Sequence, residues 1–407
     1  MIGNIEEIIN AHKGVEREIY LDIENSSPLP KEVIETMTPY FSKKAYGNPT
    51  ITHKPGWMAY ETIMAASENI AKYIDATSAE EINFTPGETE ANNLAMIGSV
   101  LANGEKGNKV IISEIEPLSI IFSSATLEKQ GFRVVKIPVD NKGFINLESL
   151  ANAVDDETVL VSIMSVNHEI GTIEPINEAV ELVKEQNPKT LFHTDASDAY
   201  GKIPLSVKES KVDLMTLSSS KILGPRGIGV LYVKEGVPVK RLLEGPIGTQ
   251  RLWPGVENTP LIMGFLKASK LSFKDFSDKI LKMSRLRDTL MNRILDEISE
   301  TLLNGPRGDK RVPDNVNVSV LHCEGEALTI ELSLNGIYVS SGSACTRRIL
   351  QPSHILTAIG RMFEAAHGSI LMKVTRYHTI SDIEHVLNVM QLAVKRLRKI
   401  SPTRRNK

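Results

Sequence analysis

The sequence predicts an α/β protein with a large domain built on a mostly parallel, seven-stranded sheet and a smaller α+β domain. Between about residues 60 and 235, short apolar runs alternate with segments of helical periodicity, the pattern of strands joined by helices in a parallel sheet. After residue 260 the pattern changes to a long amphipathic segment, alternating strands and a last helix. At 407 residues the chain also exceeds one compact core, so two domains are expected.

Seven apolar runs are the expected strands of the large domain, because each is short and alternates with helical segments. The runs span residues 81–85, 109–113, 132–139, 158–166, 190–196, 213–218 and 228–233. Segments of helical periodicity accompany them at residues 58–74, 89–104, 119–131 and 176–187. This alternation predicts a sheet covered by helices on both faces.

The remaining segments define the expected domain boundaries. Residues 276–303 predict one long amphipathic helix, residues 380–399 predict a last helix, and residues 1–14 predict an acidic amphipathic helix. We expect an N-terminal segment (1–25) that packs with the small domain, a large domain (26–260), and a small domain (261–407) that carries a cysteine loop.

The composition is that of an ordinary globular protein and limits its partners. Hydrophobic residues make up 41% and charged residues 24% of the chain. The formal net charge of −3 gives no reason to expect direct binding to nucleic acid. No run approaches the roughly 18 apolar residues of a membrane span, and residues 1–14 lack the basic-then-apolar order of a signal peptide. The basic end, residues 395–407, is a solvated helix end with a tail or a patch for an acidic partner.

The two cysteines have different surroundings. Cys323 follows an alternating apolar run, which predicts a core position. Cys345 lies among serine, glycine and alanine residues and precedes Arg347 and Arg348. Such surroundings favour an exposed thiolate, although an incidental loop thiol is the alternative. The two positions do not suggest a disulfide framework, which fits a reducing cytoplasm.

Polar residues stand at the ends of predicted strands, where sheets of this kind bind their ligands. Gly87 leads into a helix that opens with Glu88 and Thr89. The free N–H groups of such a helix start suit a phosphate, although an ordinary capped helix has the same pattern. Asp195 ends another strand, with Asp198 three residues later; a helix cap or turn former is the alternative there.

Lys221 follows three serines at the end of a further predicted strand and precedes a glycine-proline turn. We expect this lysine to be shielded from water, which would lower its pKa and suit it to Schiff-base formation. The alternative is a lysine that extends into solvent. A phosphate cradle, a strand-end carboxylate and a shielded lysine together match the requirements of pyridoxal phosphate (PLP).

With these segments in view, the sequence resembles the cysteine desulfurases of the NifS/IscS type, which have the class V aminotransferase fold. The resemblance extends from "YLDIENSSPLP" to "TRYHTISDIEHV", and its most specific match is "SSGSACT" around Cys345. It implies the fold type I of PLP-dependent transferases and conversion of L-cysteine to L-alanine, with the sulfur carried as a persulfide on Cys345. It also implies a homodimer, a cytoplasmic location, and a sulfur acceptor such as an iron–sulfur scaffold protein.

The resemblance assigns roles to matched positions. The cofactor-binding residues that it implies are Gly87, Glu88, Thr89, Asn167, Asp195, Asp198, Ser218, Ser220 and Lys221. Among these, Thr89 and Ser218 hold the phosphate, Asp195 pairs with the pyridine nitrogen, and Lys221 forms the Schiff base. Asn167, in "VNHEIGTIEP", touches the cofactor or the substrate, and Arg376, in "TRYHT", holds the substrate carboxylate through a bidentate fork.

Several positions depart from the family pattern. The departures are Pro117 for a ring-stacking histidine, Asp198 for a glutamine, Ser220 for a histidine, Val256 for a phosphate-binding threonine and Trp253 for a nearby arginine. They favour a weaker or altered grip on the cofactor. His168 and His53 are candidates to replace the missing histidine, with a structural role as the alternative for each. Two other functions are therefore open: a sulfur-handling or scaffold partner with weakened catalysis, and another PLP lyase such as a selenocysteine lyase.

Overall fold

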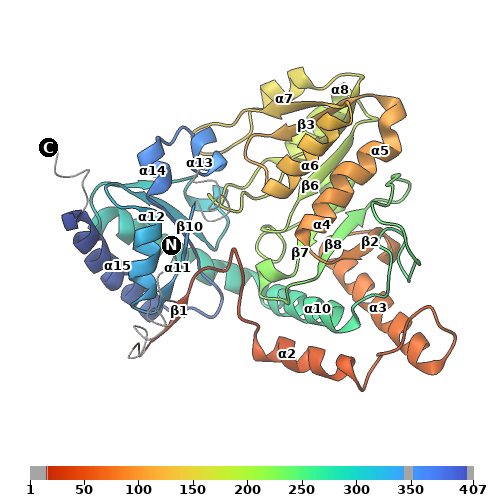
Figure 1. Cartoon of the computed structure of the whole chain (residues 1–407), viewed down its shortest axis with the longest axis horizontal. Helices are drawn as coiled ribbons and strands as arrows, with labels where there is room; N and C mark the ends of the chain where they lie inside the picture. Colours follow the sequence, from red (N-terminus) through yellow and green to blue (C-terminus); the bar gives the residue numbers. More distant parts are fainter. Residues whose placement is uncertain (1–14, 16, 343–351, 401–407) are drawn as a thin grey trace.

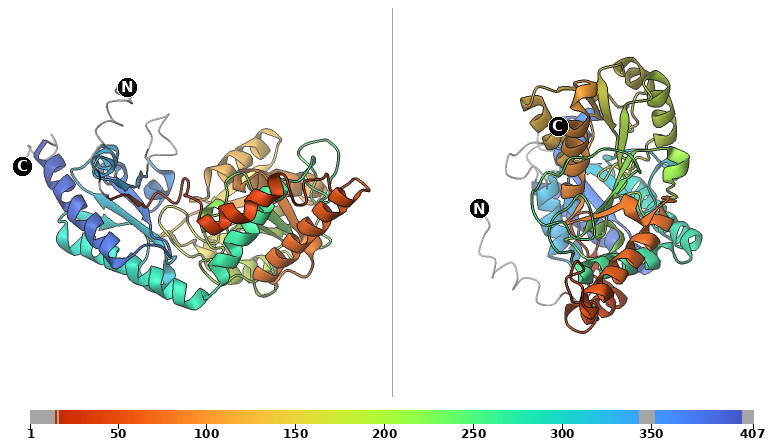
Figure 2. Two further views of the ribbon diagram at one scale, coloured as in Figure 1. Left: turned by 90° about the horizontal axis from the view of Figure 1, so that it is seen from below. Right: turned by 90° about the vertical axis from the view of Figure 1, so that its right-hand side faces the viewer.

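The computed structural model describes residue 15, residues 17–342 and residues 352–400. These residues form two units that lie side by side (Figures 1 and 2). The larger unit contains a seven-stranded sheet in the order β2-β8-β7-β6-β5-β3-β4. Its strands are β2 (Ile82–Thr85), β3 (Lys109–Ser113), β4 (Arg133–Ile137), β5 (Thr158–Ser162), β6 (Leu191–Asp195), β7 (Leu214–Ser218) and β8 (Gly229–Val233). Each lies within one of the seven apolar runs, so the predicted strands and the mostly parallel sheet are confirmed.

Helices cover both faces of this sheet, because its strands carry apolar residues on both sides. In β8, Val230 and Tyr232 belong to one buried cluster, whereas Leu231 and Val233 belong to another. The first cluster includes residues of α2 (Lys31–Met37), α3 (Lys54–Tyr73), α7 (Leu147–Ala153), α8 (Ile176–Gln186) and α10 (Thr259–Phe273). The second includes residues of α4 (Glu88–Asn93), α5 (Ser99–Asn103) and α6 (Leu118–Lys129). This is the arrangement expected of a parallel sheet.

The directions of the strands bring several polar loops to one edge. Strands β3, β5, β6 and β7 are parallel, and β8 is antiparallel to both β7 and β2. Strand β2 therefore runs in the same direction as β7. The carboxyl ends of all five strands meet at this edge, which is where open α/β sheets bind ligands.

The smaller unit contains a four-stranded sheet in the order β12-β13-β10-β9. These strands are β9 (Thr301–Leu303), β10 (Asn315–Val320), β12 (Ser340–Ser341) and β13 (Ser369–Lys373). Helices α11 (Phe276–Glu297), α12 (Gly325–Ser333) and α15 (Ile380–Ile400) share one apolar cluster with the sheet. Cys323, 7% exposed, belongs to this cluster, so its predicted core position is confirmed. The described residues also form three short helices, α9 (Val207–Ser210), α13 (His354–Ala358) and α14 (Phe363–His367).

The N-terminal part of the described chain runs beside the small unit. Strand β1 (Ile19–Tyr20) pairs in parallel with β11 (Ile337–Tyr338), and the chain then crosses to α2 of the large unit (Figure 1). Helix α10 contacts α2 and α3, although it lies beyond residue 260. The domain boundaries predicted at residues 25 and 260 stay predictions, and the predicted helix at residues 1–14 lies outside the described residues.

One predicted element is wrong at its end. Helix α11 stops at Glu297, and residues 301–303 form β9 rather than more helix. Glu300 has φ 54, a left-handed conformation that ends regular structure. Apolar residues continue through this turn, so their periodicity alone concealed the change.

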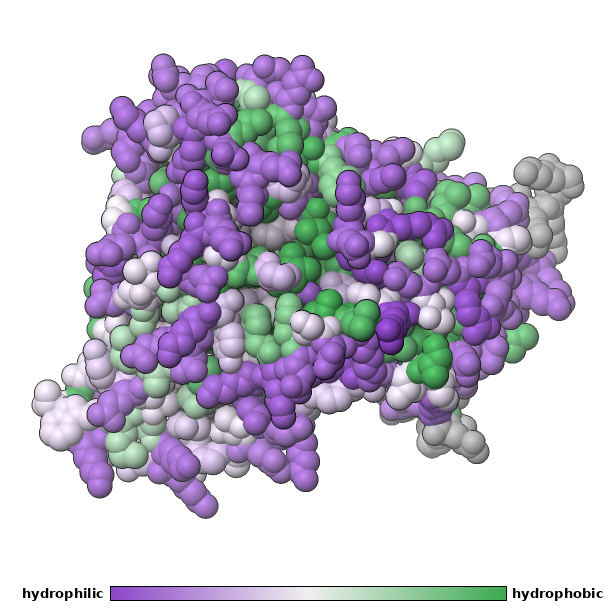
Figure 3. Space-filling model, turned by 180° about the vertical axis from the view of Figure 1, so that it is seen from behind, coloured by the Kyte–Doolittle hydropathy of each residue, from purple (hydrophilic) through white to green (hydrophobic). Residues whose placement is uncertain are grey.

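The surface is mixed. Hydrophilic residues cover most of the face in Figure 3, with hydrophobic residues in smaller groups between them. In the described part of the chain, every helix is too short or too polar to cross a membrane.

Candidate active site

Asp195 and Lys221 follow neighbouring strands at the common edge. Asp195 is the last residue of β6, and Lys221 lies in a short turn three residues after β7 ends. The Asp195 carboxyl accepts hydrogen bonds from Asn92 Nδ2 at 2.7 Å and from the Ser197 N–H at 2.9 Å. Burial raises its pKa above the ordinary value, while these two hydrogen bonds oppose the rise. The carboxyl group is thus fixed at a dry position at the strand end.

The glycine turn lies next to this carboxyl. Gly87 precedes α4, and its backbone packs so closely on β8 that a Cβ at Gly229 would lie 2.7 Å from the Gly87 carbonyl carbon. Thr85 Oγ1 donates to the Gly87 carbonyl at 2.8 Å and so fixes the turn. Glu88 is half-buried, and the loss of solvation raises its pKa to about 8. The turn therefore holds the start of α4 rigidly against the sheet.

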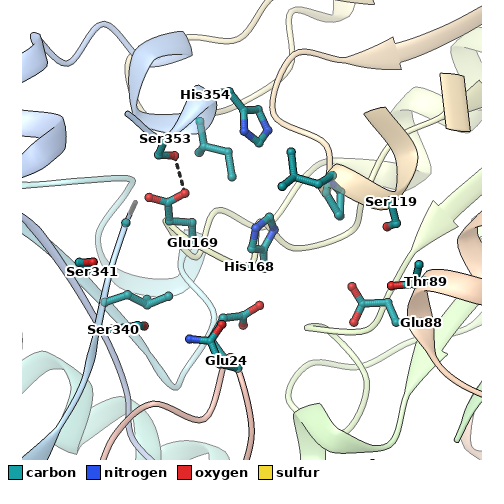
Figure 4. Close-up of a pocket in the computed structure, with 16 residues that line it drawn as sticks. Glu24, Glu88, Thr89, Ser119, His168, Glu169, Ser340, Ser341, Ser353 and His354 are labelled. Atoms are coloured by element: carbon teal, nitrogen blue, oxygen red, sulfur yellow. Dashed lines mark hydrogen bonds between the residues drawn. The ribbon is translucent and has the colours of Figure 1, made fainter. Parts of the chain in front are cut away.

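A cavity of about 210 Å³ opens between the two units (Figure 4). Its wall comes from the N-terminal segment, the start of α4, the loops after β3 and β5, and the small unit. The lining residues that carry polar or ionisable side chains include Glu24, Glu88, Thr89, Ser119, His168, Glu169, Ser340, Ser353 and His354. Gly342 and Ser353, close to the two ends of segment 343–351, also line it. Cys345 lies outside the described residues, but the chain on either side of its segment reaches this cavity.

Lys221 is paired with carboxylates. Its Nζ donates to Glu24 Oε1 and lies 3.4 Å from Asp198 Oδ2, and its side chain is 7% exposed. Burial alone would lower the pKa of Lys221, but Asp198 and Glu24 outweigh it and raise the pKa well above the ordinary value. The expected shielding is present, whereas the expected fall in pKa is wrong, because the sequence did not reveal the Glu24 carboxylate.

Asp198 is also surrounded by lysines. Lys202 lies 3.1 Å from its Oδ1, and Lys373 donates to the same oxygen. Lys373 also contacts Glu24 Oε2 at 2.5 Å, and Lys202 contacts Asp314 Oδ2 at 2.7 Å. We call Glu24, Asp198, Lys202, Lys221, Asp314 and Lys373 the charged cluster. Although burial opposes ionisation, the lysines hold the pKa of Asp198 well below its ordinary value.

The other predicted residues divide into two groups. Ser218 and Ser220 lie beside Lys221, with their hydroxyl oxygens 3.2 Å apart. Arg376 lines a small cavity of about 30 Å³ together with Lys221, and its Nη1 donates to Ser272 Oγ at 3.2 Å. Asn167, in contrast, is buried with its side chain bound to the backbone of its own turn: Oδ1 accepts from the N–H groups of Glu169 and Ile170 at 3.0 and 2.8 Å. The next two residues, His168 and Glu169, line the large cavity instead.

The positions that depart from the family pattern also have defined surroundings. Pro117 starts α6 and lines the cavity. The imidazole of His354 lies nearby, with Nε2 3.0 Å from the Glu116 carbonyl oxygen. Burial lowers the pKa of His168 to about 4, so its ring is neutral at neutral pH. His53 Nδ1 accepts from the Gly56 N–H at 3.1 Å and caps α3, which is the structural role considered for it. Val256 is 62% exposed.

Several buried polar atoms around the site have no hydrogen-bond partner among the described residues. They include His168 Nδ1, Glu169 Oε1 and Arg376 Nη2. Buried polar groups are nearly always paired, so such atoms indicate a place for a ligand. Together with the Lys221 amine, the Asp195 carboxyl and the start of α4, they fit a group with a carbonyl carbon, a basic ring nitrogen and an anionic end.

The comparison with protein families decides the relationship. The aminotransferase class-V model matches residues 19–386. The chain belongs to the aminotransferase class-V family. A protein named cysteine desulfurase IscS 1 from Archaeoglobus fulgidus is 39% identical over 383 residues, which cover 94% of this chain and 98% of that protein. One named cysteine desulfurase IscS from Clostridium botulinum is 40% identical over 387 residues, 95% of this chain and 96% of that protein.

Solved structures show the same fold. A NifS-like protein superimposes with a TM-score of 0.87 at 30% identity. The match covers 93% of this chain and 100% of that protein. A structure described as SspA in complex with cysteine has a TM-score of 0.77 at 30% identity and covers 89% of this chain and 100% of its own. The family resemblance seen in the sequence is therefore confirmed over almost the whole chain.

Sequence reasoning missed Glu24 and Lys373, the two residues that change the surroundings of Lys221 most. A signal was present: each is a charge in or beside an apolar stretch, "YLDIE" and "SILMKV". A buried charge needs a partner, so the two could have been sought together. Their pairing across 349 positions is visible only in the fold.

Proposed function

We propose that this protein is a PLP-dependent cysteine desulfurase that converts L-cysteine to L-alanine and transfers the sulfur to Cys345 as a persulfide. The observation that carries the proposal is the approach of Lys221 and Asp195, from neighbouring strand ends, beside a cavity whose wall flanks the Cys345 segment. The names of the IscS relatives, similar over nearly their whole length, support it.

The residues of the site suit each part of the cofactor. Asp195 would pair with the ring nitrogen and, as an ionised carboxylate held by Asn92 and Ser197, would keep that nitrogen protonated. Gly87, Glu88 and Thr89 at the start of α4, with Ser218 and Ser220, hold the phosphate end. Bound PLP supplies an aldehyde that condenses with an amine and a ring that takes up electrons.

Lys221 and Arg376 act on the substrate. Lys221 would hold the cofactor through its amine and, once that amine is free, would take up the α-proton of L-cysteine. The unpaired Arg376 Nη2 binds the substrate carboxylate. Asn167 keeps His168 and Glu169 at the cavity wall, since its side chain fixes the turn that carries them.

Cys345 receives the sulfur. Its thiolate attacks the sulfur of the substrate, a new S–S bond forms, and the carbon–sulfur bond breaks. The electron pair of the broken bond stays with the carbon skeleton, which takes up a proton and leaves as alanine. A sulfur acceptor, such as an iron–sulfur scaffold protein, then removes the outer sulfur.

The alternative function is a sulfur-handling partner with weakened catalysis. The departures from the family pattern give it little support, because the surroundings of these residues compensate for two of them. Asp198, which stands in place of a glutamine, adds a negative charge, but three lysines surround it. The missing histidine at Pro117 leaves His168 and His354 on the same cavity wall. We propose that the enzyme works as a homodimer in the cytoplasm.

Product analysis tests the function. Purified protein supplied with PLP, L-cysteine and a thiol reductant is expected to form alanine and sulfide in equal amounts, and Lys221→Ala is expected to lower the rate by at least about 10²-fold. A product other than alanine would indicate another PLP lyase. PLP binding without any product would favour the scaffold alternative.

A further inference from the structure

The charged cluster places six ionisable side chains where little water reaches them. Each of its side chains is at most 12% exposed. Glu24 comes from the N-terminal segment, Asp198, Lys202 and Lys221 from the large unit, and Asp314 and Lys373 from the small unit. Three lysines face three carboxylates, so the cluster is formally neutral. Removing any one charge leaves the opposite charge uncompensated in a buried site.

Glu24 stands between Lys221 and the large cavity. Its side chain lines the cavity, whereas Lys221 is absent from the described lining. Lys221 Nζ contacts both the Glu24 carboxylate and, at 3.3 Å, the Glu24 carbonyl oxygen. The lysine must leave Glu24 before its nitrogen can reach anything bound in the cavity.

Lys373 weakens the contact between Glu24 and Lys221. It lies at the end of β13, is 1% exposed, and contacts Glu24 and Asp198, the two carboxylates that Lys221 also contacts. Its positive charge draws both carboxylates away from Lys221 and repels the Lys221 ammonium group. Glu24 and Lys373 therefore act on Lys221 with opposite signs.

Other ionisable groups also lie close to the cluster. Burial raises the pKa of Glu88 to about 8 and lowers that of His168 to about 4, so both groups are largely neutral near pH 7, and Glu88 ionises as the pH rises through about 8. Asp195 interacts with Asp198, and burial raises the pKa of Asp195. Arg376 lines the same small cavity as Lys221, Lys202 and Asp314. These groups are common to the wild type and to variants at Glu24 and Lys373, so a difference between those proteins reports the substituted residues.

We propose that Glu24 and Lys373 are a pair of positioning residues with opposite effects on Lys221: Glu24 holds the lysine as an ammonium ion, and Lys373 limits that hold. Before Lys221 attacks a carbonyl carbon, an N–H bond of its ammonium breaks, the electron pair stays on nitrogen, and the proton passes to solvent water. The inference rests on the proposed function only for the identity of the carbonyl compound with which Lys221 reacts.

The test measures the reactivity of Lys221 without turnover. Full-length protein freed of cofactor is mixed with PLP, and borohydride reduction followed by peptide mass analysis gives the rate at which PLP becomes attached to Lys221, between about pH 6 and about pH 10. Glu24→Gln is expected to raise this rate about tenfold near neutral pH and to shift the profile to lower pH. Lys373→Met is expected to lower the rate about tenfold, because a carboxylate is left without its counter-charge.

The double variant, Glu24→Gln with Lys373→Met, restores neutrality and should return the profile to within about threefold of the wild type. Asp198→Asn, a second loss of a carboxylate, must shift the profile in the same direction as Glu24→Gln, so the inference stays testable if Lys373→Met does not fold. Lys184→Met is the matched control, since it breaks a similar lysine–carboxylate pair, with Asp213 at 2.6 Å, outside the cluster. It should leave the profile unchanged.

Trace acetylation of Lys221 with acetic anhydride, followed over the same pH range, repeats the test without any need for PLP recognition. We expect Glu24→Gln to raise the rate of acetylation of Lys221 and Lys373→Met to lower it, as for the attachment of PLP. If PLP fails to attach to the wild type but the acetylation order holds, the proposed cofactor is wrong and the pairing stands. Equal shifts in the same direction for Glu24→Gln and Lys373→Met, or no shift beyond about twofold, would overturn the inference.

Discussion

Glu116 is a fully buried carboxyl group beside Pro117. It accepts hydrogen bonds from Ser113 Oγ at 2.6 Å and from the Met164 N–H at 3.1 Å. Burial raises its pKa from the ordinary 4.5 to about 8. The folded protein therefore keeps a proton that the unfolded chain releases. This contribution to stability is complete below about pH 4.5 and is lost as the pH rises through about 8.

We predict that Glu116→Gln removes this dependence. The free energy of unfolding of the wild type should fall, relative to that of the variant, by up to about 1.4 kcal/mol per pH unit between the two pKa values. Urea denaturation of both proteins at a series of pH values measures the difference. Parallel profiles would mean that Glu116 is ionised in the folded protein.

At the same scale, the sequence indicated most of the site. The strand-end positions of Asp195 and Lys221 could be predicted, because a residue that ends an apolar run is at a sheet edge. The raised pKa of Lys221 could not be predicted, because it depends on Glu24 and Lys373. These residues lie 197 and 152 positions away in the chain and come close to Lys221 only in the fold. Local sequence predicts burial, but it does not predict which charges share it.

Helix α10 shows how one element supports the site. Phe265, on α10, is fully buried and packs edge-on against Tyr200, with ring centroids 5.9 Å apart. Tyr200 follows the loop that carries Asp198, and its hydroxyl donates to Ser269 Oγ of α10 at 3.0 Å. Helix α10 thus packs against the loop after β6 and stabilises its position.

We predict that Phe265→Ala lowers the free energy of unfolding by about 3–5 kcal/mol, because it leaves a cavity under this loop. Phe122→Ala is the matched control: Phe122 is 62% exposed on α6, and its loss should cost less than about 1 kcal/mol. Chemical denaturation of the three proteins gives the comparison. Similar losses for both variants would contradict the packing described for α10.

At the scale of elements, short apolar runs and segments of helical periodicity predicted the seven strands and the main helices of the large unit. The patterns failed at β9, where an apolar run continues across the left-handed residue Glu300 and periodicity does not register the turn. Strand order was also beyond the sequence, because it depends on which crossovers the helices make.

At the scale of the whole molecule, exposed apolar side chains gather in α2, α3 and the segment between them. They are Ile34, Phe41, Tyr46, Ile51, Trp57, Met58 and Tyr60. Aromatic residues and methionine are enriched at the centres of protein interfaces. This surface is our candidate for the interface of the proposed homodimer.

We predict that the chain is a dimer in solution and that Trp57→Glu weakens it by at least about tenfold, because a charge would replace an aromatic side chain at the contact. Leu392→Glu, on α15, is the control, since Leu392 is equally apolar and 69% exposed but lies in the small unit. Light scattering over a range of concentrations measures both. A monomeric wild type, or equal effects of the two variants, would exclude this interface.

A single turnover separates an active desulfurase from the alternatives. Protein loaded with PLP is mixed with L-cysteine in the absence of any sulfur acceptor or reductant, and alanine and protein-bound sulfur are counted. We predict one alanine per subunit and one extra sulfur atom on Cys345, with both lost in Cys345→Ala. Cofactor-loaded protein that forms no alanine, or a Cys345→Ala variant that still gains sulfur, would contradict it.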